Sequence, residues 1–227
     1  MTFWDHLDEL RSVLLKSLAA WLAGVVVAFC FKKPVFDLIF RELQPDQQLV
    51  NIDVTGQFMT HVEVSLLVGF VLALPLIVYW LYGFVAPALY EHEKKYSIAL
   101  AGCATGLFVL GVLLDYFLIF PFSFRFLSTY QVADSVVNRI SLSSYVSLFI
   151  GLALLMGLLF EVPVVTWFLA KMGILNAGQL RRGRKYVFVA ILIVAAVITP
   201  TGDPFTMLLV TIPIYLLYEL SIWLIRN

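Results

Sequence analysis

The sequence predicts an all-helical integral membrane protein, and three observations support this fold class. Of the 227 residues, 62% are hydrophobic and only 13% are charged. The mean hydropathy is +0.96, and a soluble domain cannot bury that much apolar surface. Apolar runs of about 20 residues, the length that spans a hydrocarbon layer of ~30 Å, recur along the chain. We therefore expect a single transmembrane domain that covers residues 1–227.

Six apolar segments are predicted to be transmembrane helices, namely 12–31, 62–84, 97–120, 145–170, 186–199 and 206–224. A cytoplasmic amphipathic segment at 1–11 comes before them. The expected connections are outer loops at 32–61 and 121–144 and cytoplasmic loops at 85–96 and 171–185. The fifth segment has about 14 residues and would be roughly 21 Å long, which is shorter than the hydrocarbon layer. The last two helices are therefore expected to form a short hairpin.

The distribution of Lys and Arg predicts which side faces the cytoplasm. Ten of the fifteen basic residues fall on the side that holds both termini, and five fall on the other side. Because cytoplasmic loops carry an excess of Lys and Arg, both termini are expected to be cytoplasmic. The formal net charge is zero, which argues against a nucleic-acid partner.

Each of the three helices expected to run from outside to inside contains a proline: Pro75, Pro163 or Pro213. Proline removes a backbone donor and clashes with the carbonyl four residues earlier, so each helix should kink. Three kinks in the same direction would shape the helices into a concave bundle.

Aromatic residues gather in and beside the two outer loops and are expected to anchor them at the membrane surface. They are Phe36, Phe40, Phe58, Phe120, Phe122, Phe124 and Phe126.

Nothing in the sequence indicates an enzyme, a metal site or a cofactor. The two cysteines, Cys30 and Cys103, lie inside apolar runs and are expected to be packing residues. There is no CxxC pair or Cys/His cluster, and none of the common hydrolase motifs is present.

The first candidate site is HLDELR at residues 6–11. Apolar residues at three- and four-residue steps form one face of a helix there, and acids gather on another. Asp5 and Glu9 are four residues apart, where like charges repel, so a cationic ligand would relieve the repulsion. The alternative is a solvated helix start, where acids favour the helix dipole.

The second candidate site is the turn FVAPALYEHEKK at residues 84–95. Pro87 fixes the turn, and Phe84 and Tyr90 can pack it against the membrane surface. Glu91 and Glu93 lie two residues apart and so point to different sides, and only one of them is expected to face the same site as Glu9.

The third candidate is Glu161, which lies about ten residues, or roughly 15 Å, before Lys171. A charge near mid-membrane costs on the order of 3 kcal/mol, which favours a functional role. Its neighbour Pro163 leaves a backbone carbonyl unpaired and so creates a polar notch. An alternative function built on this residue is a proton-coupled secondary transporter centred on Glu161. Asp115 is expected to reach water at the outer interface and to be structural.

These motifs, in their order and spacing, closely resemble TatC, the core receptor subunit of the twin-arginine protein translocase. The resemblance rests on HLDELR at 6–11, FVAPALYEHE at 84–93, FEVP at 160–163, RRGRKY at 181–186 and TPTGDP at 199–204. It implies that the signal-peptide-binding residues are Glu9, Glu93, Phe84, Leu7, Arg11, Pro87 and Tyr90. It also implies that Glu161 and Pro163 meet a polar side chain of a partner helix, and that Asp203 belongs to a periplasmic turn.

The same resemblance implies a function and a set of partners. The protein would bind Arg-Arg signal peptides on its cytoplasmic face and nucleate a complex that exports folded proteins with the proton motive force. Its partners would be the single-span subunits TatA and TatB, folded cargo and membrane lipids, with several copies in each complex. It would reside in a bacterial or archaeal cytoplasmic (inner) membrane and would need no cofactor.

Overall fold

Long apolar runs fold as helices throughout the computed structural model, which describes residues 3–43, 48–85, 97–131, 133, 138–198 and 204–226. The helices are α1 (Phe3–Cys30), α2 (Lys32–Ile39), α3 (Gly56–Val85), α4 (Ser97–Leu114), α5 (Phe120–Thr129), α6 (Leu142–Phe160), α7 (Val162–Lys171), α8 (Ala177–Ile198) and α9 (Pro204–Arg226). A 3₁₀ turn, Phe40–Glu42, follows α2, and a π-helical turn, Asp115–Ile119, joins α4 to α5. The described ranges contain no β-strand, which confirms the all-α fold class.

Four stretches of the described chain are long and apolar enough to cross a membrane: His6–Cys30, Gly56–Phe84, Ile98–Thr129 and Leu142–Lys171. They correspond to the first four predicted spans. The apolar part of α9 is shorter, Val210–Ile225, and α8 carries a basic first third. With 22 and 23 residues, α8 and α9 are longer than the short helices predicted there. Neither is among the four apolar spans, so a count of six crossings stays a prediction.

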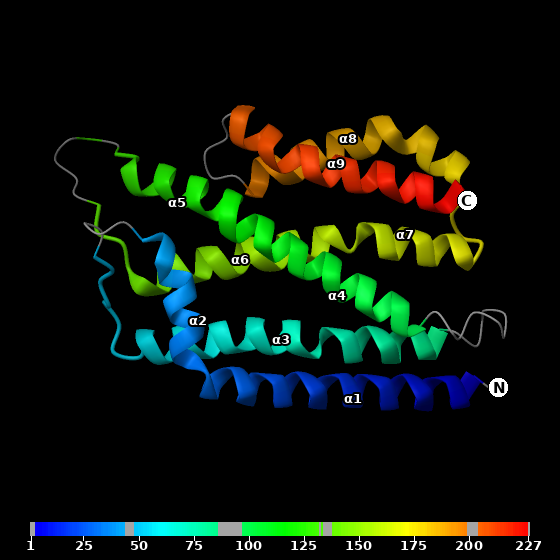
Figure 1. Ribbon diagram of the computed structural model, residues 1–227, viewed down its shortest axis with the longest axis horizontal. Helices are drawn as coiled ribbons and strands as arrows, with labels where there is room; N and C mark the ends of the chain where they lie inside the picture. The colour runs from blue at the N-terminus through cyan, green and yellow to red at the C-terminus, as the bar shows by residue number, and fades with distance from the viewer. Residues whose placement is uncertain are drawn as a thin grey trace.

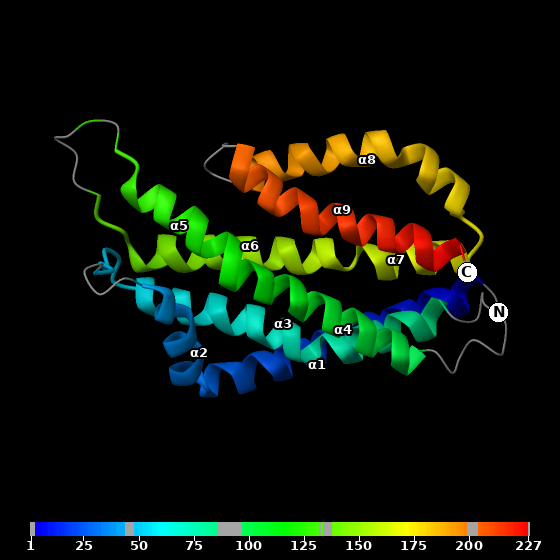
Figure 2. The ribbon, with the colours of Figure 1, turned by 45° about the horizontal axis from the view of Figure 1, so that its top comes forward.

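The helices form two groups on either side of α6 and α7 (Figure 1). On one side α1 packs along α3, and α3 packs against α4 and α6; on the other, α8 packs mainly against α9, and α9 against α7. Both chain termini lie at the same end of the bundle, where α7 also turns into α8 (Figures 1 and 2).

The core lies around α6 and is dominated by buried aromatic and aliphatic side chains. Tyr145, Phe149 and Met156 of α6 meet Tyr116 and Phe120 there. The prediction of membrane-surface phenylalanines is therefore wrong for Phe120 and Phe124, which pack inside. It fits the exposed side chains, which are Phe58, Phe122 and Phe126.

Hydrogen bonds close the end of the bundle opposite the termini. The hydroxyl of Tyr145 donates to the carbonyl of Ile39 at 2.9 Å, and that of Tyr116 donates to the carbonyl of Leu38 at 2.8 Å. The N–H of Val50 donates to the carbonyl of Ile140 at 2.9 Å, which ties the segment before α3 to the segment before α6. The helix α2 is thereby fixed across this end.

Of the three prolines, Pro163 alone interrupts its helix. The long helix Leu142–Lys171 divides at Glu161, and the N–H of Glu161 donates to the carbonyl of Leu158 at 3.1 Å. Pro75 and Pro213 lie inside α3 and α9, which continue through them. The sequence predicted a kink in all three helices, and the structure shows an interruption beside Pro163. The concave shape of the bundle stays a prediction.

The segment 171–185, predicted as a loop, is largely helical. Gly173, with a φ of +74°, lies in the left-handed region that favours glycine and follows the end of α7. Asn176 and Gln179 then cap α8 reciprocally: the N–H of Gln179 donates to Asn176 Oδ1 at 2.8 Å, and the N–H of Asn176 donates to Gln179 Oε1 at 2.9 Å. The basic cluster therefore lies on the first turns of α8.

Two further expectations about single side chains are wrong. Cys30 and Cys103 are free thiols with exposed side chains, and so they do not pack in the core. Asp115 does not reach water, because its side chain is 0% exposed.

Candidate functional site

The HLDELR motif forms the start of α1, which continues without a break into the first apolar span. Leu7 and Arg11 are exposed, and Glu9 is half-buried. A motif that is continuous with a long helix is held in a fixed orientation relative to the rest of that helix.

The motif meets the end of α3 through aromatic stacking. The rings of His6 and Phe84 lie with centroids 4.3 Å apart and an interplanar angle of 15°. Glu9 follows His6 by three residues, or about 4.5 Å along the helix axis. The first two sequence motifs therefore meet at the end of the bundle that holds the chain termini. Pro87, Tyr90, Glu91 and Glu93 lie outside the described residues.

Close backbone packing between α1 and α3 supports this meeting point. A Cβ on Gly24 would come within 2.6 Å of the carbonyl oxygen of Gly69, and one on Gly69 would come within 2.5 Å of the backbone N of Val25. Trp21 Nε1 also donates to the carbonyl of Leu66 at 3.0 Å. Such contacts between small residues allow two helix backbones to approach closely in a membrane.

Glu161 occupies the break between α6 and α7, and Pro163 behind it is buried. Oε1 of Glu161 is buried and has no hydrogen-bond partner in the described part of the chain. A buried carboxyl oxygen without a partner is rare in proteins and can accept a hydrogen bond from a polar group that arrives on another molecule.

An apolar cavity of about 480 Å³ opens between α6 and α8. It is lined by Ser147, Leu148, Gly151, Leu152, Leu155, Ile193 and Val194. Leu155 precedes Glu161 by six residues, about 9 Å along the helix. Gly151 has no atom within 4 Å of its Cβ position, so the cavity has room for a side chain from a neighbouring helix.

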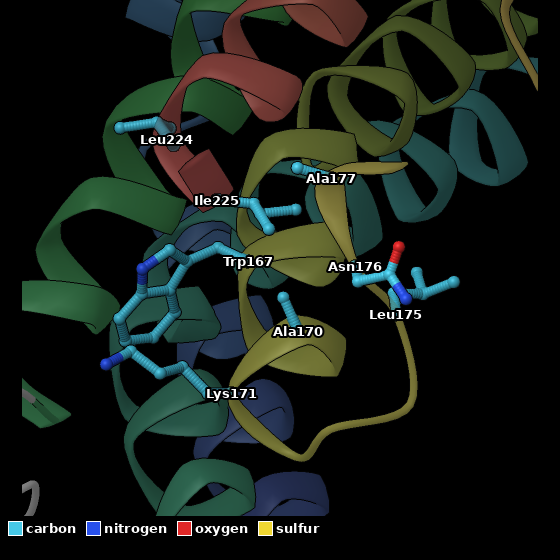
Figure 3. Close-up of a pocket in the computed structure, with 8 residues that line it drawn as sticks. All are labelled: Trp167, Ala170, Lys171, Leu175, Asn176, Ala177, Leu224 and Ile225. Carbon is cyan, nitrogen blue, oxygen red and sulfur yellow. The ribbon is translucent and has the colours of Figure 1, made fainter. Parts of the chain in front are cut away.

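A second cavity, of about 530 Å³, lies between α7, α9 and the start of α8, at the end of the bundle that holds the chain termini. Figure 3 shows Trp167 and Lys171 of α7 on one wall and Leu224 and Ile225 of α9 on another. The ammonium of Lys171 is 5.7 Å from the centre of the Trp167 ring, a cation–π distance. No predicted site residue lines this cavity.

Sequence reasoning missed two features of the described chain. One is Asp115, whose two carboxyl oxygens are both buried without a partner in the π-helical turn. The other is the ion pair between Arg184 and Glu219, 2.6 Å between nitrogen and oxygen. The pairing joins residues 35 positions apart, so no local pattern predicts it. Asp203 lies outside the described residues, and the described part contains no cluster of metal-ligating residues.

Comparison with known proteins gives consistent matches over nearly the whole chain. Residues 5–213 match the family profile described as TatC, Sec-independent protein translocase protein. The TatC protein of Aquifex aeolicus is 36% identical over 99% of this chain and 94% of its own length. The TatC protein of Carboxydothermus hydrogenoformans is 32% identical over 100% of this chain and 93% of its own length.

Solved structures agree in both fold and sequence. A crystal structure described as "Twin Arginine Translocase Receptor- TatC in DDM" superposes with a TM-score of 0.83 at 36% identity and covers 98% of this chain and 100% of that chain. A second crystal structure, described as "Twin Arginine Translocase Receptor- TatC", gives a TM-score of 0.77 at 36% identity and covers 97% of this chain and 98% of that chain. The chain belongs to the TatC family of Sec-independent protein translocase proteins.

Proposed function

We propose that this translocase subunit is the receptor for signal peptides that carry two adjacent arginines. The family transports proteins across the membrane, so the chain is a transport subunit and not an enzyme. The observation that supports the receptor role is the stacking of His6 on Phe84. It joins the acidic start of α1 to the end of α3, from which the connection that contains Glu93 departs.

In this proposal Glu9 and Glu93 each accept one arginine of the signal. A guanidinium donates two parallel hydrogen bonds to a carboxylate, whereas lysine offers only a point charge. Two carboxylates on separate elements would therefore select Arg-Arg over Lys-Lys by geometry. Leu7, Arg11, Phe84, Pro87 and Tyr90 would shape and support this site.

The two arginines do not account for the whole affinity. If each arginine–carboxylate pair is counted as one charged interaction of about 1.5–3 kcal/mol, the two pairs contribute about 3–6 kcal/mol, whereas micromolar binding requires about 8 kcal/mol. The apolar stretch of the signal peptide would supply the difference by lying along the apolar outer surface of the bundle.

Glu161 and the cavity between α6 and α8 are proposed as the place where single-span partners of the TatA and TatB type dock. A partner helix would fill the cavity beside Gly151 and offer a polar side chain to the unpaired Oε1 of Glu161. The proposal has four further parts. The complex contains several copies of this chain, both termini lie in the cytoplasm, Asp203 belongs to a periplasmic turn, and the proton motive force drives export. The rival function, a proton-coupled transporter of small solutes, is not supported by membership of a protein translocase family.

Peptide binding to the purified protein in detergent tests the receptor role. We expect a twin-arginine peptide to bind at least tenfold more tightly than its twin-lysine counterpart, a difference of about 1.4 kcal/mol. Glu9→Gln and Glu93→Gln should each weaken arginine-peptide binding by about 10- to 100-fold, since each removes a charged hydrogen-bond acceptor.

Asp8→Asn is the matched control, because Asp8 is an exposed acid beside Glu9 on the same helix. It should change the affinity less than twofold. Equal binding of the two peptides, or unchanged binding after both Glu substitutions, would refute the proposed receptor site.

A further inference from the structure

Four basic residues, Arg181, Arg182, Arg184 and Lys185, are exposed on the first turns of α8, at the end of the bundle that holds the termini. Arg184 pairs with Glu219 of α9. The other three have no ion-pair partner among the residues that the structure describes. Four cations and one carboxylate leave a formal charge of +3 on this surface.

The start of α8 is fixed to α9 by specific contacts. Oε2 of Glu219 accepts from Arg184 at 2.6 Å, and Oε1 accepts from the hydroxyl of Tyr215 at 3.0 Å. The buried hydroxyl of Tyr218 donates to the carbonyl of Leu180 at 2.7 Å. These bonds hold the guanidinium of Arg184 in place before any ligand arrives, which lowers the entropy lost on binding.

A cavity of about 340 Å³ lies between the two helices and is lined by Arg181, Arg184, Glu219, Ile222 and Trp223. Arg181 and Arg184 are three residues apart and so lie on one face of α8. Arg182 and Lys185 do not line the cavity. The basic cluster thus contains two cations at a cavity and two elsewhere on the same surface.

Exposed apolar side chains lie further along both helices, beyond the lining of the cavity. Val189 of α8 is 52% exposed, and Leu216 of α9 is 63% exposed. Trp223, at the edge of the cavity, is 59% exposed, and tryptophan is enriched at the headgroup level of membranes. The surface therefore offers two arginines for an anion and apolar walls for attached chains.

We propose that this cavity binds the phosphate headgroup of an anionic glycerophospholipid. Arg181 and Arg184 would donate to the phosphate oxygens in the bidentate geometry that guanidinium favours. Trp223 would lie against the glycerol region, and the acyl chains would follow the exposed apolar residues of α8 and α9. Basic pockets between membrane helices are known to select anionic headgroups. A general excess of positive charge would set the orientation of the chain but would not require two arginines at one cavity.

The proposal is tested by native mass spectrometry of the full chain, with phosphatidylglycerol titrated against phosphatidylcholine. The double variant Arg181→Gln/Arg184→Gln should lose phosphatidylglycerol affinity at least tenfold, about 1.4 kcal/mol. The control Arg182→Gln/Lys185→Gln removes the same charge from the same helix outside the cavity and should lose less than threefold. Equal losses in the two double variants, or no loss in either, would overturn the assignment.

Two further arms separate the remaining outcomes. Arg184→Gln leaves Glu219 without its cation, so the single variant Arg181→Gln, which preserves that ion pair, is tested as well. It should weaken lipid binding about threefold. An unchanged affinity would overturn the proposal. Inorganic phosphate at 10 mM, a concentration chosen for the competition, should not displace the lipid. Displacement would mean that the cavity takes a free anion and not a lipid.

Discussion

Substitution of Gly69 by alanine would test whether close packing of α1 on α3 sets the geometry of the proposed receptor site. The new Cβ would lie 2.5 Å from the backbone N and 2.7 Å from the Cα of Val25. Ordinary contact begins at 3.4 Å, so the two helices would have to separate locally by about 0.9 Å. Backbone atoms cannot rotate away as a side chain can, and α1 has its main packing contacts with α3.

The expected cost follows from overpacking. Extra methyl groups forced into a packed contact cost about 1–3 kcal/mol, which for a chain of this size lowers Tm by roughly 2–4 °C per kcal/mol. We expect Gly69→Ala to lower Tm in detergent by a few to about 10 °C and to weaken twin-arginine peptide binding, because the start of α1 shifts relative to Phe84. Thermal unfolding followed by size-exclusion chromatography and peptide titration measure the two effects.

Gly102→Ala is the matched control, since Gly102 is also in a transmembrane helix and has nothing within 4 Å of its Cβ position. Its Tm and peptide affinity should stay at the values of the unaltered protein. If Gly69→Ala behaves like Gly102→Ala in both assays, the inference that this contact positions the site is wrong.

Two acids with buried carboxyl oxygens give the remaining predictions. Asp115→Val should raise the free energy of unfolding by about 1–3 kcal/mol, because it removes two buried oxygens that have no partner among the described residues. A loss of stability in thermal unfolding would show that the carboxyl has a partner. Glu161→Leu should reduce co-purification of a single-span partner at least tenfold while peptide affinity stays within twofold, since Oε1 would no longer accept a hydrogen bond. Glu161→Gln keeps an oxygen acceptor and should retain most of the partner. Equal recovery of the partner with the unaltered protein, Glu161→Leu and Glu161→Gln would exclude this docking role.

Those parts of the fold that depend on local chemistry were predictable from the sequence. Apolar length alone predicts the four long spans, and the ring of Pro163 predicts the break at Glu161. The boundary of α8 was not predicted, because its basic residues suggested a loop. The Asn176–Gln179 capping pair is a local signal that could have placed the start of α8 there.

Features that depend on contacts between distant segments could not be predicted in this way. Phe120 was expected at the membrane surface, but Tyr145 and Phe149 of α6 enclose it. The Gly24–Gly69 contact joins two helices through residues that carry no side-chain pattern. For the candidate site, the sequence indicated Glu9 and Phe84 separately, and the stacking of His6 on Phe84 became visible only in the folded chain.

The unbroken length of α1 has a consequence for the bilayer that surrounds the protein. Its 28 residues give a helix of about 42 Å, whereas the hydrocarbon layer is ~30 Å thick. If the Cys30 end lies at the outer edge of that layer and the helix is upright, roughly eight residues emerge on the other side, and Glu9 lies close to the boundary. Longer acyl chains would then draw this carboxylate into hydrocarbon, while shorter ones would lift it further into water. Under the proposed receptor role, the affinity for the signal peptide would therefore depend on membrane thickness.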